Sequence, residues 1–176
     1  LNQFAKLMTP SASLTAPWLN AQLSSNLNLY FTGQLLREPA RLALVADLSG
    51  QPWFPLQGVL RGNIEAQPAE GKYPHLDYNL TASEIVFEEI KANTVQARGT
   101  FAWPALDIAE ARAAFEDGST IRVGGRLDCS QPSVSSGSIE LEGPLFQRWL
   151  PEGYSYADLA LSANLDGPFD HLQHQG

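Results

Sequence analysis

The sequence predicts an all-β fold, built as one long sheet of short, kinked strands with a single apolar face. Apolar and polar residues alternate along most of the chain after residue 26, and a period of two places successive side chains on opposite faces of a strand. The alternation changes parity every few residues, as happens where a strand bulges and then resumes with the same face inward. Asp117-Gly118 is a hairpin turn signal, because glycine readily accepts a positive φ.

The alternating runs give the expected strands in chain order. The segment 109–115 is ambiguous, because Ala, Glu and Arg favour helix while all its odd positions are apolar; we favour a strand. SVSSGS at 133–138 is interpreted as a polar linker between strands, and Val-Gly-Gly-Arg at 123–126 as a strand bulge. The remaining strands are expected at 27–31, 42–48, 56–66, 76–82, 85–87, 90–92, 95–103, 106–108, 121–127, 139–141 and 159–165.

One to three short helical segments are also expected. The best candidate begins at Pro144 and stops at Pro151, with apolar residues at i, i+1, i+4 and i+5 between them. A similar spacing occurs at 18–23, and residues 1–8 suit an amphipathic turn or two. The chain is therefore expected to be a single β segment over 27–176, preceded by a helical or irregular lead-in over 1–26.

Composition limits the function. Only 17% of the 176 residues are charged and the net charge is −8, which argues against nucleic acids and anionic membrane surfaces as partners, because both favour Lys and Arg clusters. Any lipid must then be met through apolar contact. No run of 18 apolar residues is present. Because the sequence opens at Leu1 in what resembles mid-protein sequence, we expect a segment of a larger envelope protein.

Motifs of catalysis are missing from the sequence, so we expect no enzyme, no cofactor and no metal. His171 and His174 form an HxxH pair without a third ligand at a matching spacing, which is more typical of an exposed tail. Cys129 is interpreted as a small apolar side chain at the end of a strand. The glycines form no phosphate-binding pattern.

The apolar face has two interpretations that alternation alone does not separate. Its aromatic residues could fill the core of a closed β-sandwich or barrel. The same face could instead line an open groove that takes acyl chains. The aromatic residues expected there are Tyr78, Phe87, Phe101, Trp103 and Phe115.

Two stretches resemble a known family. The run at 76–128, with its late D-G-S-x-I-x-V-x-G-x-L-D, and the closing ADLALSANLDGPFDHLQHQG are similar to the periplasmic repeats of the TamB and AsmA-like family. The resemblance implies a taco-like half-pipe with an apolar interior, in a protein anchored in the inner membrane that extends through the periplasm of a Gram-negative-type cell. Members are linked to phospholipid movement towards the outer membrane and, with an outer-membrane barrel partner, to outer-membrane protein assembly. We expect the anchor and any partner-docking region to lie outside these 176 residues.

The expected function is therefore conduction of phospholipid acyl chains between the inner and outer membranes along a hydrophobic groove. One alternative is a scaffold or chaperone-like module for the assembly of outer-membrane β-barrel proteins, and another is a closed β-sandwich acting as an adhesin or spacer. The residues expected to line the groove are Leu76, Tyr78, Leu80, Ile85, Phe87, Val95, Phe101, Ile108, Phe115, Ile121, Val123, Leu127, Ile139, Leu141, Leu159, Leu161 and Leu165.

Overall fold

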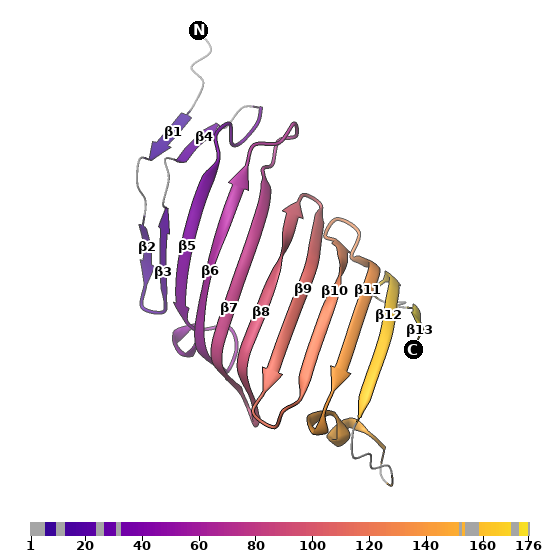
Figure 1. The fold of residues 1–176 in the computed structure, drawn as a ribbon. Helices are drawn as coiled ribbons and strands as arrows, with labels where there is room; N and C mark the ends of the chain where they lie inside the picture. Colours follow the sequence, from indigo (N-terminus) through magenta and orange to yellow (C-terminus); the bar gives the residue numbers. More distant parts are fainter. Residues whose placement is uncertain are drawn as a thin grey trace.

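The computed structural model describes residues 6–9, 13–23, 27–30, 33–151, 153, 159–169 and 173–175, and it confirms the all-β fold (Figure 1). Eleven strands form one open, curved antiparallel sheet in the order β13-β12-β11-β10-β9-β8-β7-β6-β5-β3-β2. Its strands are β2 (Ser13–Ala16), β3 (Leu19–Leu23), β5 (Ala40–Asp47), β6 (Leu56–Gln67), β7 (His75–Phe87), β8 (Ile90–Ala102), β9 (Ala105–Phe115), β10 (Thr120–Asp128), β11 (Ser133–Glu142), β12 (Ala160–Pro168) and β13 (Gln173–Gln175).

A second, two-stranded sheet pairs β1 (Lys6–Thr9) with β4 (Leu27–Tyr30). The main sheet therefore passes directly from β3 to β5, and from β5 to β13 every strand pairs with its neighbours in sequence. The ambiguous segment 109–115 is strand, as favoured. The Asp117-Gly118 turn joins β9 to β10 as predicted, with Gly118 at φ +86°.

Bulges explain the parity changes in the sequence. In β7, which has one residue more than β6 at this point, Glu84 has φ +55°, so the strand resumes at Ile85 with its apolar side chains still on the same face. The predicted Val-Gly-Gly-Arg bulge is confirmed, since the register of β10 shifts between Val123 and Gly125. The linker expected at 133–138 is wrong: these residues begin β11, and a bulge around Ser136, at φ +52°, absorbs the change of register.

The helical predictions are met in part. A 3-10 helix, η2 (Pro144–Trp149), occupies the predicted place, and a second, η1 (Leu48–Gly50), was not expected. The helix expected at 18–23 is wrong, because Leu19, Ala21 and Leu23 also alternate and pair with β5 as strand β3. The lead-in over 1–26 therefore contains strands β1, β2 and β3 in place of helix; residues 1–5 lie outside the described residues.

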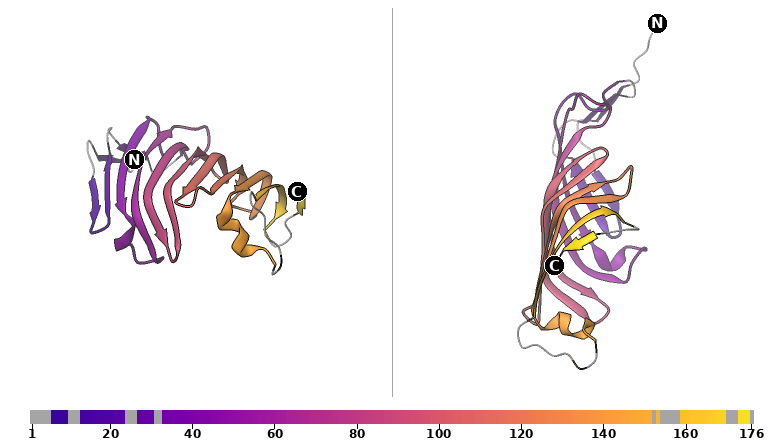
Figure 2. Two further views of the ribbon diagram at one scale, coloured as in Figure 1. Left: turned by 60° about the horizontal axis from the view of Figure 1, so that its bottom comes forward. Right: turned by 90° about the vertical axis from the view of Figure 1, so that its right-hand side faces the viewer.

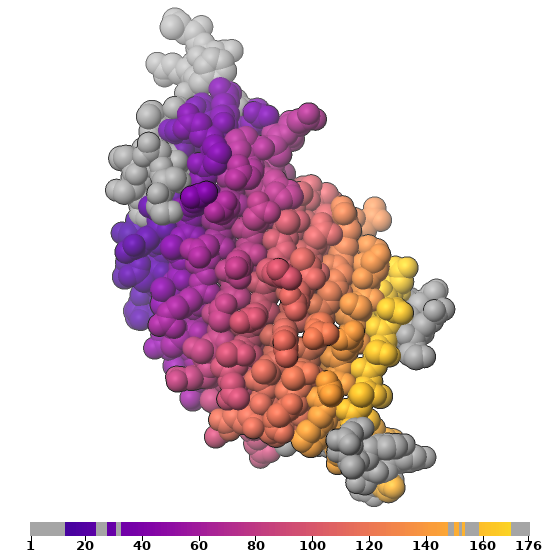
Figure 3. Space-filling view, viewed as in Figure 1, coloured from indigo at the N-terminus to yellow at the C-terminus, as the bar shows by residue number. Residues whose placement is uncertain are grey.

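The sheet curves into a half-pipe, and η2 lies on its concave side (Figure 2). In the described part of the chain no second sheet is stacked on the main one, so a closed sandwich or barrel is wrong for these residues. A space-filling view of one face likewise shows the rows of strands running on without a covering layer over the coloured residues (Figure 3). With a rise of about 3.3 Å per residue and about 4.8 Å between strands, the sheet is roughly 43 Å across at β7 and 48 Å along its ten intervals.

Candidate functional site

Cross-strand register builds a continuous apolar face. A single row of paired positions crosses the sheet from β2 to β12 without a polar residue, because every bulge restores the same face. Most side chains of this face are only half-buried, as expected for a surface that no second layer covers. The row consists of Leu14, Ala21, Leu44, Gly62, Leu80, Ala97, Ala111, Val123, Ile139 and Ala163.

The middle of this face is hollowed where β6 to β9 meet. The hollow has a volume of about 360 Å³, within the range of about 300–1,000 Å³ typical of small-molecule sites. Leu80, one of the lining residues, leans over Gly62 at the paired position of β6, where a β-carbon would lie 2.4 Å from the Leu80 Cδ2. The lining side chains are Ile64, Leu76, Tyr78, Leu80, Ala97, Phe101, Leu106, Ile108 and Ala111.

Tyr78 brings the one hydroxyl to this lining. Its ring lies over Gly99, where an added β-carbon would be 2.9 Å from Cζ. Its Oη donates a hydrogen bond to the carbonyl oxygen of Asp107 at 3.2 Å, next to the bulge where Arg98 and Gly99 of β8 pair with Glu110 and Ile108 of β9. Burial, with the Asp107 carboxylate adding to it, raises the pKa of Tyr78, so the hydroxyl stays protonated and neutral at physiological pH.

The structure divides the predicted groove residues into three groups. Five line the hollow: Leu76, Tyr78, Leu80, Phe101 and Ile108. Eight share the same face beyond it, with Phe87 and Leu161 the most exposed of them: Ile85, Phe87, Val95, Val123, Leu127, Ile139, Leu161 and Leu165. Four pack with the η2 segment: Phe115, Ile121, Leu141 and Leu159.

The last group was expected to line the groove, but in the structure these residues pack under the η2 segment. Phe146 of η2 is 1% exposed and meets the Phe115 ring edge to face at 6.2 Å. Ser119, itself fully buried, accepts a hydrogen bond from the Leu145 N–H at 2.9 Å and so fixes the start of η2. Leu159 precedes β12 and is buried in this cluster, so it lines no open surface.

One further expectation needs correction. Trp103 lies in the β8–β9 turn and is 53% exposed, since β8 ends at Ala102. Cys129 follows directly after β10, close to the strand end where it was expected, and it is exposed. Four lining residues were not on the predicted groove list, although they belong to the same alternating runs; the pairing of each with a predicted residue across the strands would have identified them. These are Ile64, Ala97, Leu106 and Ala111.

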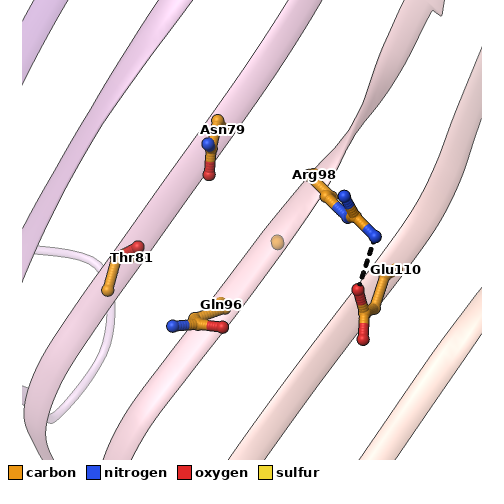
Figure 4. Close-up of a pocket in the computed structure, with 6 residues that line it drawn as sticks. Asn79, Thr81, Gln96, Arg98 and Glu110 are labelled. Atoms are coloured by element: carbon orange, nitrogen blue, oxygen red, sulfur yellow. Dashed lines mark ion pairs between the residues drawn. The ribbon is translucent and has the colours of Figure 1, made fainter.

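The opposite face of the same strands is polar. A depression of about 470 Å³ there is lined by Asn79, Thr81, Gln96, Arg98 and Glu110, with an Arg98–Glu110 ion pair at 2.9 Å (Figure 4). Similar cross-strand pairs follow on other strands, Arg41–Glu65 at 3.1 Å and Arg122–Glu140 at 2.8 Å. These side chains are solvent-exposed and satisfy one another, which is the usual arrangement of a solvated sheet surface. The apolar hollow is therefore the stronger candidate site.

Three searches of known proteins found no match to this chain, whether among family models, curated proteins or solved structures. The described residues include no group of three or more His, Cys, Asp or Glu side chains placed to hold a metal ion. The HxxH pair is not described as a unit, since His171 lies outside the described residues. Among the described residues, no helix has the length and apolar character needed to cross a membrane.

Proposed function

We propose that this chain is a segment of a periplasmic envelope protein whose concave apolar face carries phospholipid acyl chains between the inner and outer membranes. The observation that supports the proposal most directly is the uninterrupted apolar row across ten strands on a face that η2 covers only at one corner. Each methylene that leaves water for such a surface gains about 0.8 kcal/mol, so a continuous path lowers the barrier that a lipid meets in water.

Dimensions also favour this function. An acyl chain occupies half of a hydrocarbon core about 30 Å thick, so it is roughly 15 Å long. The apolar row crosses ten strands, whose nine intervals extend about 43 Å, and this leaves room for an acyl chain to move from the hollow towards either end of the row without leaving the apolar surface. The phosphate and headgroup would remain in water, since the hollow offers them only the Tyr78 hydroxyl.

The test compares two aspartates placed in adjacent positions of β7. Leu80 lies in the hollow, whereas Thr81 is exposed on the polar face and pairs with Arg61 and Gln96. Leu80→Asp should abolish binding of a phospholipid with a fluorescent acyl chain, because the carboxylate would have to be desolvated by the bound chain. Thr81→Asp should bind the same phospholipid as the wild type does.

Transfer of the labelled phospholipid from donor to acceptor vesicles gives the second readout, with Phe101→Asp as an independent obstruction of the hollow. Far-UV circular dichroism confirms that each variant is folded. If Leu80→Asp and Phe101→Asp bind and transfer lipid like the wild type, the proposed function is wrong.

A scaffold for outer-membrane β-barrel proteins is the second candidate, and the sheet edges favour it. At one edge β13 pairs only with Asn164 to Asp166 of β12, so within the described residues Ala160 to Ala163 have a strand partner only on the β11 side. Such an edge can accept an extended segment by β-augmentation. Crosslinks from Ser162 to a purified, unfolded outer-membrane barrel protein, without crosslinks from the hollow, would favour this function over lipid conduction.

A further inference from the structure

The β5–β6 loop presents the two most exposed aromatic side chains of the described residues. Trp53 and Phe54 are 65% and 68% exposed and stand side by side between Pro52 and Pro55. The sequence from residue 48 to residue 60 contains no charged side chain. An exposed, uncharged aromatic pair of this kind is unfavourable in water and is typical of a contact surface.

The loop is held in shape by internal contacts. The Gln51 Oε1 accepts hydrogen bonds from the Trp53 N–H at 2.8 Å and the Phe54 N–H at 3.0 Å, and its Nε2 donates to the Phe54 carbonyl. The Leu56 N–H donates to the same carbonyl at 2.8 Å. The Trp18 ring meets Trp53 edge to face at 5.1 Å, so the aromatic pair is presented by a preformed loop.

These hydrogen bonds indicate which surroundings the loop suits. The N–H groups of Trp53 and Phe54 and the Phe54 carbonyl are satisfied by hydrogen bonds within the loop. Such internal hydrogen bonding is what a water-poor, lipid environment requires of non-helical backbone. Tryptophan also prefers the region between headgroups and hydrocarbon, where its ring is apolar and its N–H remains wet. The β6–β7 loop, at the opposite end of β6, is less suited to a lipid environment, because it contains the charged residues Glu70 and Lys72.

The charged side chains near the loop further limit the kind of membrane surface that it can contact. Leu56 pairs with Phe87, so the β7–β8 turn with its exposed Glu88 and Glu89 lies at the same end of the sheet as the aromatic loop. These carboxylates repel an anionic surface but have little effect on an electrically neutral one. We propose that residues 48–55 form a membrane-contact loop, with Trp53 and Phe54 inserting into the interfacial layer of a neutral phospholipid bilayer. This contact does not depend on acyl-chain binding by the concave face.

Flotation of the 176-residue chain with phosphatidylcholine vesicles tests the proposal. The wild type should float with the vesicles, and Trp53→Ser/Phe54→Ser should reduce the vesicle-bound fraction at least roughly ten-fold, because the inserted aromatic area is lost. The matched control is Tyr73→Ser/Trp103→Ser, which removes two exposed aromatic rings, 6.1 Å apart, from the opposite ends of the strands. This control should float like the wild type.

The Leu80→Asp variant distinguishes vesicle binding by the loop from phospholipid binding by the concave face. This variant should still float with the vesicles, although it should not bind a single phospholipid. The proposal is overturned if the wild type does not float, if Leu80→Asp or the Tyr73/Trp103 control loses flotation as strongly as the Trp53/Phe54 variant, or if flotation requires anionic lipid. A change of oligomeric state in the Trp53/Phe54 variant without any effect on flotation would also overturn it, in favour of a protein contact.

Discussion

The Tyr78 hydroxyl donates a hydrogen bond across β8 to the carbonyl oxygen of Asp107 on β9, at 3.2 Å. The phenol ring crosses Gly99 to reach it, and the acceptor lies beside the bulge that omits Ala109 from the β8–β9 register. One side chain of the apolar face thereby joins three strands and satisfies a backbone carbonyl at an irregular point of the sheet.

Loss of this hydroxyl should change the pH dependence of stability. Tyr78→Phe is expected to lower the free energy of unfolding by about 1 kcal/mol near pH 8. Because the folded-state pKa of Tyr78 is raised above its ordinary value of 10.0, the stabilisation that comes from the raised pKa is fully present below about pH 10 and is lost as the pH rises above it. The difference between wild type and variant in urea unfolding should therefore narrow by about pH 11; an unchanged difference at the two pH values would contradict this role.

Gly99 should tolerate no side chain. A β-carbon at this position would lie 2.0 Å from the Asp107 carbonyl oxygen and 2.6 Å from the Tyr78 hydroxyl. Gly99→Ala is expected to reduce the free energy of unfolding by about 1–3 kcal/mol, measured by urea denaturation. Gly71→Ala is the control, since a β-carbon there meets nothing within 4 Å, and its effect should stay within about 0.5 kcal/mol. Equal effects of the two substitutions would show that the close approach at Gly99 is unimportant.

Phe146 should be the most important side chain of the η2 cluster. It is buried against Leu145 and Leu159, so Phe146→Ala should destabilise the protein by about 3 kcal/mol through lost contacts and the cavity left behind. Phe54→Ala removes the same side chain from a position that is 68% exposed and should change stability by less than about 0.5 kcal/mol. Thermal unfolding of both variants measures the contrast. A Phe146 variant as stable as the Phe54 variant would mean that η2 is not packed in solution.

The ion pairs of the polar face should contribute little to stability. Arg98 and Glu110 are 67% and 37% exposed at the side chain, so water and salt screen their attraction. A double-mutant cycle with Arg98→Ala and Glu110→Ala should give a coupling energy of about 0.2–1 kcal/mol that declines as salt is added. A coupling energy several times larger and independent of salt would indicate a role for this face beyond solubility.

Much of the fold could be predicted because period-two alternation reports directly which side chains share a face of a strand. The parity changes in β7 and β9 were visible in the sequence as well, since apolar residues resume one position late at Ile85 and Ala111. Residues 18–23 were wrongly predicted as a helix, because the spacing of Trp18, Leu19 and Leu23 fits a helix while that of Leu19, Ala21 and Leu23 fits a strand. The pairing with β5 decides between the two, and no local pattern contains that information.

The hollow and the packing of η2 on one corner of the apolar face were beyond sequence reasoning for a different reason. Leu80 and Tyr78 of the hollow lie over Gly62 and Gly99 on the neighbouring strands, and this placement requires the register of each strand pair. The pattern at 144–150 indicated a helical turn, but the surface that Phe146 covers is set by Ser119, 27 positions earlier in the chain (146 − 119), through its bond to Leu145. Contacts between distant segments of this kind leave no periodic signal.

The hairpin order from β5 to β12 has a mechanical consequence. Each strand from β6 to β12 is hydrogen-bonded only to the strands next to it in sequence, so a strand at the edge of the sheet can be peeled away while the rest of the sheet keeps its pairing. A molecule stretched by its two ends should therefore yield in successive small steps, each releasing a strand of about ten residues and roughly 33 Å of extended chain. The end-to-end distance at a given force would then indicate how many strands are still paired in the sheet.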